Sequence, residues 1–560
     1  MCGITGYLSA RTFTAEVLEN MTRALTRRGP DAEGYFRSNQ IHLGHRRLSV
    51  IDIEGSKQPL FNESGTIALV FNGEIYNYRE LRRELITAGH HFKTEGDSEV
   101  LVHAYESYGP NMVHKLDGMF AFAIWDAPND ILFLARDPLG IKPLYYYWDG
   151  DLFAFGSELK AILQHPGMRR DIDLDSIALY LECQYIPAPR SIYQKVKKLR
   201  AGHTLTLRCG QIDEWRYWVP DFSKKLVCSD EEVTSLVEAS LGRSVESMLV
   251  ADVPLGAFVS GGVDSSLIAA LMTDRSGSAI DTFTLGFVED DEHSEHHQAL
   301  QVSKHIGSRH HVLMIEPLTV LDAFSKWTEV FDEPFGDQAG LPTLMLAEFA
   351  RREVTVALTG EGADEVFAGY DNYKKRVREE RIVAKFTWPG SPFPGLIRHL
   401  PAILRKDRIL KAISKPLSER YGTIPNVFDE ALRPSLLSEK FNAAIFDSVS
   451  QVASQFFREC NASSYMDRIM YVDTRMWLTD DLLTKVDRAT MAHSLEARVP
   501  YLDRQLVELA FRIDPETKHR GDVTKFILKR IAEKYLPAEI VYRRKQGFHM
   551  PLRRWLAHLH

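Results

Sequence analysis

The arrangement of apolar runs changes near residue 220, and this change requires a fold with two different kinds of sheet. In the first part, Met119–Asp126 and Ile131–Asp137 are short β-branched or aromatic runs separated by the turn residues Pro128-Asn129-Asp130. Leu144–Trp148 and Leu152–Phe155 repeat this arrangement around a second turn. Short strands joined by such turns are typical of antiparallel hairpins. With two helical stretches among them, these runs predict a β-layered domain covered by helices.

Beyond residue 220 the pattern is one of strands alternating with helices. Ser229-Asp230-Glu231-Glu232 is a capping box that predicts a helix ending near Val250. Helical stretches then separate apolar runs at 254–259, 282–287, 311–315 and 354–358. This alternation predicts a doubly wound parallel sheet, which binds ligands beyond the carboxyl ends of its strands. Because composition breaks at Trp215–Lys225, we expect one domain over residues 1–218 and a second, helical in its last third, over 219–560.

The composition is that of a globular protein without a nucleic-acid-binding face. The 560 residues are too many for a single hydrophobic core, and the formal net charge is -8. A nucleic-acid-binding protein would need a basic face. No apolar run approaches a membrane span, and no basic stretch followed by an apolar one opens the chain. We therefore expect a cytoplasmic protein with neither nucleic acid nor membrane among its partners.

The spacing of cysteine and histidine does not favour a disulfide framework or a metal site. The five cysteines are scattered and form no CxxC pair, which fits a reducing compartment. The three His-His pairs are His90-His91, His296-His297 and His310-His311. None of them sets two ligands at helical spacing with a carboxylate, so a metal role is not favoured for any pair.

Cys2 stands directly after the initiator Met, and removal of that Met would make it the first residue. Its α-amino group, with a reference pKa of about 7.7, would then lie beside its thiol. Such a residue can use its own amine as the base that accepts the thiol proton. Many cysteines in this position are simply small residues at a chain start, so the position alone does not establish chemistry.

Cys2 begins the first of five polar clusters that packing does not require. The clusters are Cys2-Gly3-Ile4, Arg27-Arg28-Gly29-Pro30-Asp31, Arg47-Leu48-Ser49, Asn72-Gly73-Glu74-Ile75-Tyr76-Asn77 and Gly96-Asp97-Ser98-Glu99. Each alone is typical of a turn or cap, and Asn72-Gly73 alone would predict a hairpin turn. In this order they resemble the glutaminase domain of class II amidotransferases, which has an N-terminal-nucleophile fold of stacked β-sheets between helix layers.

The resemblance implies a role for each of these residues. Cys2 would attack the side-chain amide of glutamine, while the Asn72 side chain and the Gly73 N–H would form the oxyanion hole. Arg47 would hold the α-carboxylate of glutamine, because a guanidinium can bind a carboxylate through two parallel N–H groups. Glu74 and Asp97 would take the α-ammonium end. The implied glutamine site comprises Arg47, Leu48, Ser49, Val50, Ile51, Asn72, Gly73, Glu74 and Asp97.

A glycine-rich loop, Ser260-Gly261-Gly262-Val263-Asp264-Ser265-Ser266, follows the first strand of the second domain. Glycines let backbone N–H groups approach an anion, serines add hydroxyl donors, and the following helix adds its N-terminal dipole. The loop lacks the Lys and the spacing of a Walker loop, so γ-phosphate transfer is not indicated. Such turns also occur for packing alone, but the whole motif resembles the pyrophosphate loop of ATP pyrophosphatases. Asp264 within it suits a Mg²⁺ ligand.

A second glycine-rich loop, Thr359–Phe367, follows the apolar run at 354–358 and carries three acids. A solvated acidic turn is the alternative interpretation. Resemblance to the synthetase domain of asparagine synthetases implies that Asp364 joins Asp264 on Mg²⁺ and that Glu361 helps to form an acyl-adenylate. The implied ATP site comprises Leu255, Ser260, Gly261, Gly262, Asp264, Ser265, Ser266, Leu285, Thr359 and Gly360.

The segment Asp480–Arg488 is the third part of the implied synthetase site. Asp481 and Lys485 stand four residues apart, so on a helix they could simply pair at the surface. The family match covers this segment and implies that Lys485 meets the phosphates and the charge of the transition state. Lys545-Gln546-Gly547-Phe548 also matches the family.

The resemblance covers nearly the whole chain and implies glutamine-dependent asparagine synthesis from aspartate, with ATP as co-substrate and Mg²⁺ as cofactor; it also leaves room for a homodimer. Asp332–Asp337, where acceptor contacts are expected, resembles a bacterial branch that includes enzymes amidating cell-wall or surface-polysaccharide carboxylates. Another carboxylate acceptor is therefore the alternative. Intact catalytic residues argue against a silent paralogue, and the intact glutaminase set argues against a β-lactam-forming synthetase.

Overall fold

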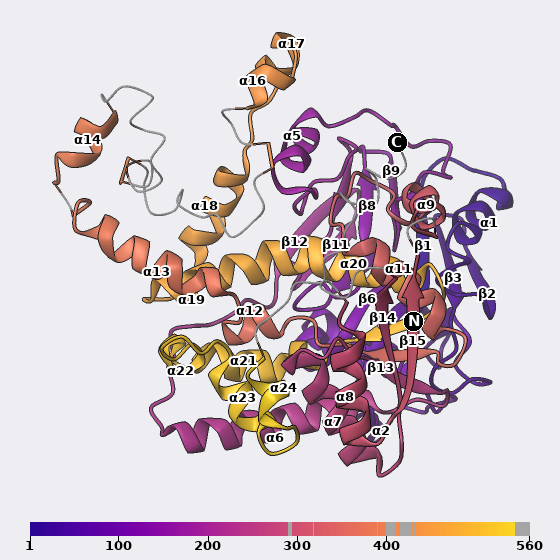
Figure 1. Ribbon diagram of the computed structural model, residues 1–560. Coiled ribbons are helices and arrows are strands. Elements are labelled where there is room, and N and C mark those ends of the chain that lie inside the picture. Colours follow the sequence, from indigo (N-terminus) through magenta and orange to yellow (C-terminus); the bar gives the residue numbers. More distant parts are fainter. Residues whose placement is uncertain are drawn as a thin grey trace.

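The computed structural model describes residues 1–543 apart from 289–293, 317–318, 389, 399–409, 411–412, 415–426 and 429–431. Within these residues, two antiparallel sheets and one parallel sheet form the framework (Figure 1). The first sheet has the order β10 (Val196–Lys198), β8 (Tyr145–Trp148), β9 (Leu152–Gly156), β1 (Cys2–Ser9), β3 (Ile41–Arg47), β2 (Ala32–Arg37). The second has the order β12 (Gln211–Arg216), β11 (His203–Arg208), β7 (Ile131–Arg136), β6 (Gly118–Asp126), β5 (Ile67–Ile75), β4 (Leu60–Phe61).

The two antiparallel sheets face one another across a hydrophobic core. Ile4, Val70 and Phe155 are fully buried in it. The helices α1 (Ala15–Arg23) and α4 (Leu159–Ile162) pack on the outer face of the first sheet, and α2 (Tyr78–Thr87) and α3 (Glu99–Tyr108) pack on that of the second. Sheets stacked between helix layers confirm the predicted N-terminal-nucleophile architecture.

The third sheet is parallel throughout and confirms the doubly wound prediction. Its order is β15 (Arg309–Ile315), β14 (Asp281–Phe287), β13 (Leu255–Phe258), β16 (Val356–Leu358), β17 (Glu496–Arg498). The central β13 is followed along the chain by β14 on one side, whereas β16 lies on its other side. The order of the strands therefore reverses between β13 and β16, and the carboxyl ends of these two strands flank the crevice where ligands bind in such sheets.

The helices of the second half enclose this sheet, while α14, α16 and α17 lie apart from it (Figure 1). The predicted capping box at Ser229 is present and begins α6. The further helices are η1 (Gly109–His114), α5 (Leu174–Cys183), α6 (Asp230–Met248), α7 (Val263–Ser276), α8 (His296–Ile306), α9 (Thr319–Ser325), α10 (Trp327–Val330), α11 (Gly340–Ala350), α12 (Ala363–Phe367), α13 (Asp371–Ala384), α14 (Phe393–Arg398), α16 (Arg433–Leu436), α17 (Glu439–Ala443), α18 (Val449–Glu459), η5 (Pro500–Leu502), α21 (Arg504–Arg512), α22 (Pro515–Lys518), α23 (Phe526–Ala532) and α24 (Ala538–Val541).

One long helical segment runs between the two halves of the molecule. It consists of α19 (Tyr465–Asp473), the π-helical stretch η4 (Thr474–Leu482) and α20 (Leu483–Met491), which follow one another directly. Figure 1 shows α20 close to the strands of the first half and to α11 of the second. π-Helical stretches often mark functional sites. No helix among the described residues is long and apolar enough to cross a membrane.

The Asn72-Gly73 pair is not the hairpin turn that it would predict alone. Strand β5 continues to Ile75, and Asn72 and Gly73 pair with Ala121 and Phe120 of β6. Glycine is required by the close approach of β6, since a Cβ atom at Gly73 would lie 2.1 Å from the carbonyl oxygen of Met119. The strand therefore fixes the Asn72 side chain more firmly than a turn would.

Two candidate active sites

Cys2 is the first residue of β1, and pairing with the end of β3 holds its backbone. Its partner in the register is Arg47. Only 8% of the residue is exposed, and burial raises the pKa of the Cys2 thiol. The terminal ammonium and the Leu48 N–H act in the opposite direction, because both stabilise a thiolate. A thiol in this setting needs a base beside it before it can attack a substrate.

The Asn72 amide lies against Cys2 with its oxygen bonded and its nitrogen available. Asn72 Oδ1 accepts the Cys2 N–H at 3.0 Å, and the residue is fully buried. Asn72 Nδ2 has no hydrogen-bond partner among the described residues. A buried donor left unpaired costs about 1–3 kcal/mol, so its presence here points to a state in which the NH₂ group meets an acceptor.

Met1 lies in a buried acidic recess next to the thiol. Its ammonium group donates to Glu496 Oε2 at 2.7 Å, and its carbonyl oxygen accepts the Leu48 N–H at 3.1 Å. Arg498 lies 2.6 Å from Glu496 and 3.5 Å from Glu74. Residues of β17, in the second half of the molecule, therefore form one wall of the predicted glutamine site.

The acids of this recess favour a positively charged ligand. Burial, together with the nearby Glu496 carboxylate, raises the pKa of Glu74 well above its usual value and that of Asp97 to about 6. Asp97 Oδ2 also accepts the Ile75 N–H at 2.9 Å. A cation in the recess would stabilise the ionised carboxylates. The recess therefore suits the α-ammonium group of an amino acid, the role implied for Glu74 and Asp97.

The guanidinium of Arg47 is engaged largely by backbone carbonyl groups. Nη1 donates to Ile53 O at 2.7 Å, and Nη2 donates to Ile51 O at 3.3 Å and Asp52 O at 2.6 Å. Arg47 thus fixes the loop at 51–53, a role that the sequence did not reveal, and two of its five N–H groups remain for a substrate carboxylate. The predicted glutamine-site residues Leu48, Ser49, Val50 and Ile51 connect β3 to this loop, and Leu48 and Val50 are each 2% exposed.

The second candidate site is a cavity of about 450 Å³ at the carboxyl ends of β13 and β16. It lies where the strand order reverses, as expected for a doubly wound sheet. The predicted residues that line it are Ser260, Gly262, Asp264, Ser265, Leu285, Thr359, Gly360, Glu361, Asp364 and Lys485. Val259 and Phe287 add apolar wall that the sequence did not indicate.

Three residues predicted for the ATP site are not part of the cavity wall. Leu255 begins β13 at the end of the strand opposite the loops, so it cannot reach a ligand at the carboxyl edge. Gly261 packs against α8, where a Cβ atom would lie 2.6 Å from Gln298 Cβ. Ser266 is fully buried within α7. Lys545-Gln546-Gly547-Phe548 lies outside the described residues.

Lys525 brings the two predicted metal ligands together. Its Nζ forms ion pairs with Asp264 Oδ2 and, at 2.7 Å, with Asp364 Oδ1. Burial lowers the pKa of Lys525, but the two acids outweigh burial and raise it overall. Two carboxylates that converge on one cation fit Mg²⁺, which takes one or two carboxylates together with phosphate oxygens. Lys525 and Lys529 also line the cavity, although they were not predicted from the sequence. Their spacing of four residues, which places both on one face of a helix, is the sequence feature that could have indicated them.

Lys485 reaches the same cavity from α20. Its Nζ lies 3.3 Å from Asp337 Oδ2 and 3.7 Å from Glu361 Oε1. These acids raise the pKa of Lys485 even though burial lowers it, so the side chain is a fixed cation. The simple surface pair between Asp481 and Lys485 is wrong, because Asp481 is 2% exposed and its pKa is raised well above its usual value by burial.

A buried ion-pair network joins the two sites. Arg28 donates to both carboxylate oxygens of Asp487, at 2.7 and 3.0 Å, and to Glu158 at 3.0 Å. Its Nε donates to the carbonyl oxygen of Cys2 at 3.1 Å. Asp487 lies on α20, two residues after Lys485. Arg28 therefore contacts both the backbone of the candidate nucleophile and the helix that carries the lysine of the second site.

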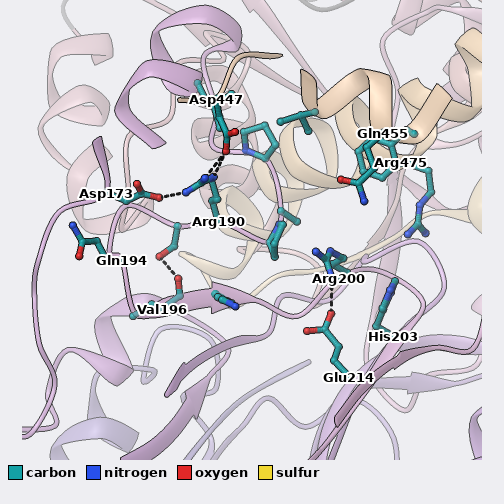
Figure 2. Close-up of a pocket in the computed structure, with 18 of the residues that line it drawn as sticks. Asp173, Arg190, Gln194, Val196, Arg200, His203, Glu214, Asp447, Gln455 and Arg475 are labelled. Carbon is teal, nitrogen blue, oxygen red and sulfur yellow. Dashed lines mark hydrogen bonds and ion pairs between the residues drawn. The ribbon is translucent and has the colours of Figure 1, made fainter. Parts of the chain in front are cut away.

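A further cavity of about 740 Å³ is separate from both sites (Figure 2). Paired charges line it, among them Arg190 with Asp173 and Asp447, and Arg200 with Glu214. No residue predicted for catalysis or binding is among the residues that line it. Its size alone therefore does not make it a reaction site.

Comparison with known proteins gives a family match for each half of the chain. A family model described as asparagine synthase matches residues 236–560, and one described as glutamine amidotransferase domain matches residues 1–218. "Asparagine synthetase [glutamine-hydrolyzing] 1" of Bacillus subtilis (strain 168) is 36% identical over 568 residues, which cover 99% of this chain and 88% of the relative.

Two other relatives show the breadth of the group. A "Putative asparagine synthetase [glutamine-hydrolyzing]" of Mycobacterium tuberculosis (strain ATCC 25618 / H37Rv) is 34% identical over 590 residues, with 99% of this chain and 88% of the relative covered. "Amidase chyE" of Penicillium rubens is 27% identical over 612 residues, with 99% and 89% covered. The chain therefore belongs to the asparagine synthase family, as a member in which a glutamine amidotransferase domain precedes the synthase domain.

Proposed function

We propose that this chain makes asparagine from aspartate and ATP, with ammonia that its first domain releases from glutamine. One observation carries the proposal: the buried Arg28–Asp487 pair lies between a thiol with an available amide donor and the loop-lined cavity of the second half. Because this ion pair contacts the first site and the helix that carries Lys485 of the second, the two sites belong to one connected structure. Ammonia could then pass between them inside the protein, where it is not lost by protonation in water.

In the first reaction, removal of Met1 would leave the α-amino group on Cys2. That amine would accept the thiol proton while the sulfur attacks the amide carbon of glutamine. Asn72 Nδ2 and the Gly73 N–H would donate to the developing oxyanion, and ammonia would leave as the Cys2 thioester forms. Water would then release glutamate. Glu74, Asp97 and the remaining N–H groups of Arg47 would bind the two charged ends of the substrate.

In the second reaction, the aspartate side-chain carboxylate would attack the α-phosphorus of ATP, and the bond to pyrophosphate would break. The Ser260 and Gly360 loops would hold the phosphates, and Glu361 would help to form the acyl-adenylate. Lys485 and Lys525 would neutralise charge that develops on them. Mg²⁺ held by Asp264 and Asp364 would supply further neutralisation of the leaving pyrophosphate. Ammonia would then attack the acyl carbon and release AMP.

Replacement of the nucleophile separates the two reactions. We expect Cys2→Ala to lose glutamine-dependent asparagine formation and to keep synthesis from added ammonia, measured as asparagine and pyrophosphate released. Cys183→Ala is the matched control, because Cys183 is a buried thiol in α5 that donates to backbone carbonyls and faces neither site. Loss of both activities in Cys2→Ala would contradict the division of roles.

The acceptor is tested with aspartate. Relatives at lower identity include one named an amidase, so another carboxylate is the alternative acceptor. With ammonia and ATP supplied, pyrophosphate release should depend on aspartate. If glutamine hydrolysis is intact but no aspartate-dependent pyrophosphate appears, the acceptor is another carboxylate and the assignment of the first site still holds.

A further inference from the structure

Four potential metal ligands meet on the outer side of the second sheet, away from both candidate active sites. They come from three segments: Glu63 from the loop between β4 and β5, His90 from the turn after α2, and His103 and Glu106 from α3. One ligand atom from each residue lies within 4.8 Å of all the others. The sequence did not favour a metal role for His90-His91, because the pair does not set two ligands at helical spacing with a carboxylate; in the structure the other ligands come from distant segments.

The histidine–carboxylate distances in this cluster are close to those between neighbouring ligands of a tetrahedral metal ion. His90 Nδ1 lies 3.5 Å from Glu63 and 3.7 Å from Glu106, and His103 Nδ1 lies 3.5 and 3.4 Å from the same two carboxylates. Ligand bonds of about 2.0–2.1 Å in tetrahedral geometry separate neighbouring ligand atoms by about 3.3–3.4 Å. The four ligand atoms lie within 4.8 Å of one another, so the longest separations among them would shorten by up to about 1.5 Å when all four bind one ion.

The outer nitrogens of the two imidazoles differ in their partners. His90 Nε2 lies 2.8 Å from Ser107 Oγ, whereas His103 Nε2 is buried without a hydrogen-bond partner in the described part of the chain and lies 3.6 Å from the Glu99 carboxylate. An N–H at Nε2 leaves the lone pair of Nδ1 directed at the cluster, as in the carboxylate–histidine–metal arrangements of known sites. A neutral Nδ1 facing two carboxylates is repelled by them unless a cation lies between.

The carboxylates are oriented as well. Asn62 Nδ2 donates to Glu106 Oε1 at 2.8 Å, and the His91 N–H donates to Glu63 Oε1 at 2.9 Å. With both imidazoles neutral, the two ionised carboxylates would give the cluster a charge of −2, which one divalent ion would neutralise. His103 is 1% exposed in its side chain, so this charge is partly removed from water. Burial lowers the pKa of His103, but Glu99, Glu63 and Glu106 outweigh burial and raise it overall, so a proton competes with a metal ion there.

We propose that Glu63, His90, His103 and Glu106 form a structural Zn²⁺ site. Four protein ligands would fill a tetrahedral shell, and a shell without an open position is typical of a structural rather than a catalytic zinc. The ion would tie α3 to the end of α2 and to the β4–β5 loop. Asp97 lies two residues before the start of α3. By fixing the position of α3, the ion would therefore also stabilise one wall of the proposed glutamine recess.

Protonated histidines are the rival explanation, because an imidazolium can also satisfy carboxylates at these distances. The two explanations differ in what they predict for the purified full-length chain. A zinc site binds one ion, and its loss lowers stability at a pH where histidine is neutral. A proton-only cluster binds no zinc and loses stability as the pH rises from 6 to 8 whether or not zinc is present.

The test is metal titration of chelator-treated, full-length protein at pH 7.5. We expect one Zn²⁺ per chain by elemental analysis, a rise in melting temperature on adding Zn²⁺, and the visible absorption bands of tetrahedral Co²⁺ when that ion is used instead. His103→Gln and His90→Gln should lower Zn²⁺ affinity at least 100-fold. His91→Gln is the matched control, because its side chain is outside the cluster and its backbone N–H is retained.

A second variant protects the test against misfolding. Glu106→Gln keeps an oxygen for Asn62 to bond but removes the ligand charge, so it should fold and still lose Zn²⁺ affinity. Zn²⁺ bound equally well by Glu106→Gln or His103→Gln would place the ion elsewhere and overturn the proposal. Absence of stoichiometric Zn²⁺ or of any Zn²⁺-dependent melting shift would overturn it as well. All readouts are independent of enzymatic activity.

Discussion

Replacing Asn72 with alanine tests whether its unpaired NH₂ group is the oxyanion donor. Removing one donor of an oxyanion hole costs about 10²–10³ in kcat, or about 2.7–4 kcal/mol of transition-state stabilisation. Stability should change little. The variant loses the bond from the Cys2 N–H, worth about 1 kcal/mol, but it also removes a buried donor whose desolvation costs about 1–3 kcal/mol. Asn72→Ala should therefore lose glutaminase activity while its folding stability stays close to that of the parent.

The assay is glutamate release at saturating glutamine, with pyrophosphate release from added ammonia measured on the same preparation. We expect the first to fall by the factor given above and the second to stay within about twofold, because Asn72 does not line the second cavity. Asn77→Ala is the matched control. Asn77 follows on the same segment, but its side chain binds Lys115 O and the Asp117 N–H instead.

Glutaminase activity of Asn72→Ala within tenfold of the parent would refute the role of Asn72 as oxyanion donor. A fall of both activities together, with a drop of many degrees in melting temperature, would refute it in a different way. The amide would then hold the structure together, and its free NH₂ group would have no catalytic meaning.

Two further predictions concern charge at the two sites. Because burial raises the pKa of Asp97 to about 6, protonation below that pH removes the partner of the glutamine ammonium. The KM for glutamine should then be about tenfold higher at pH 5 than at pH 7.5, and an unchanged KM would exclude Asp97 from binding. Lys525→Met should lower the kcat of pyrophosphate release about 10–10³-fold and reduce the Mg²⁺ concentration needed for half-maximal rate, because Asp264 and Asp364 lose their competing cation. A higher Mg²⁺ requirement would contradict that competition.

The sequence predicted the features that depend on short segments of the chain, such as helix starts and the type of sheet. The capping box at Ser229 begins α6, and the alternation of apolar runs with helices predicted both the parallel sheet and the edge at which the Ser260 and Gly360 loops meet. Leu255 was predicted for the ATP site from the family resemblance, but the structure places it at the amino end of β13, outside the cavity wall. On a parallel strand, only residues at the carboxyl end and beyond reach the crevice.

What the sequence could not predict depends on contacts between segments far apart in the chain. Lys525 lies 261 residues from Asp264, and nothing local to either residue indicates that they form an ion pair. The metal cluster is similar, because its ligands come from separate turns and helices and only His103 and Glu106 have helical spacing. Such constellations are defined by tertiary packing, so a search for neighbouring ligands in the sequence misses them.

The short strand β17 determines how mutations near either site should be interpreted. Glu496 of this strand accepts a hydrogen bond from the Met1 ammonium group in the acidic recess, and Arg498 lies beside Glu74. The carbonyl oxygen of Arg498 accepts the N–H of Thr359, the first residue of the loop that lines the cavity proposed to bind ATP. A change of charge in the recess therefore acts on a strand that directly holds the second site. Altered pyrophosphate release in a β17 variant would not by itself place that residue in the synthetase reaction, and only glutaminase and ammonia-dependent rates measured together would assign its effect.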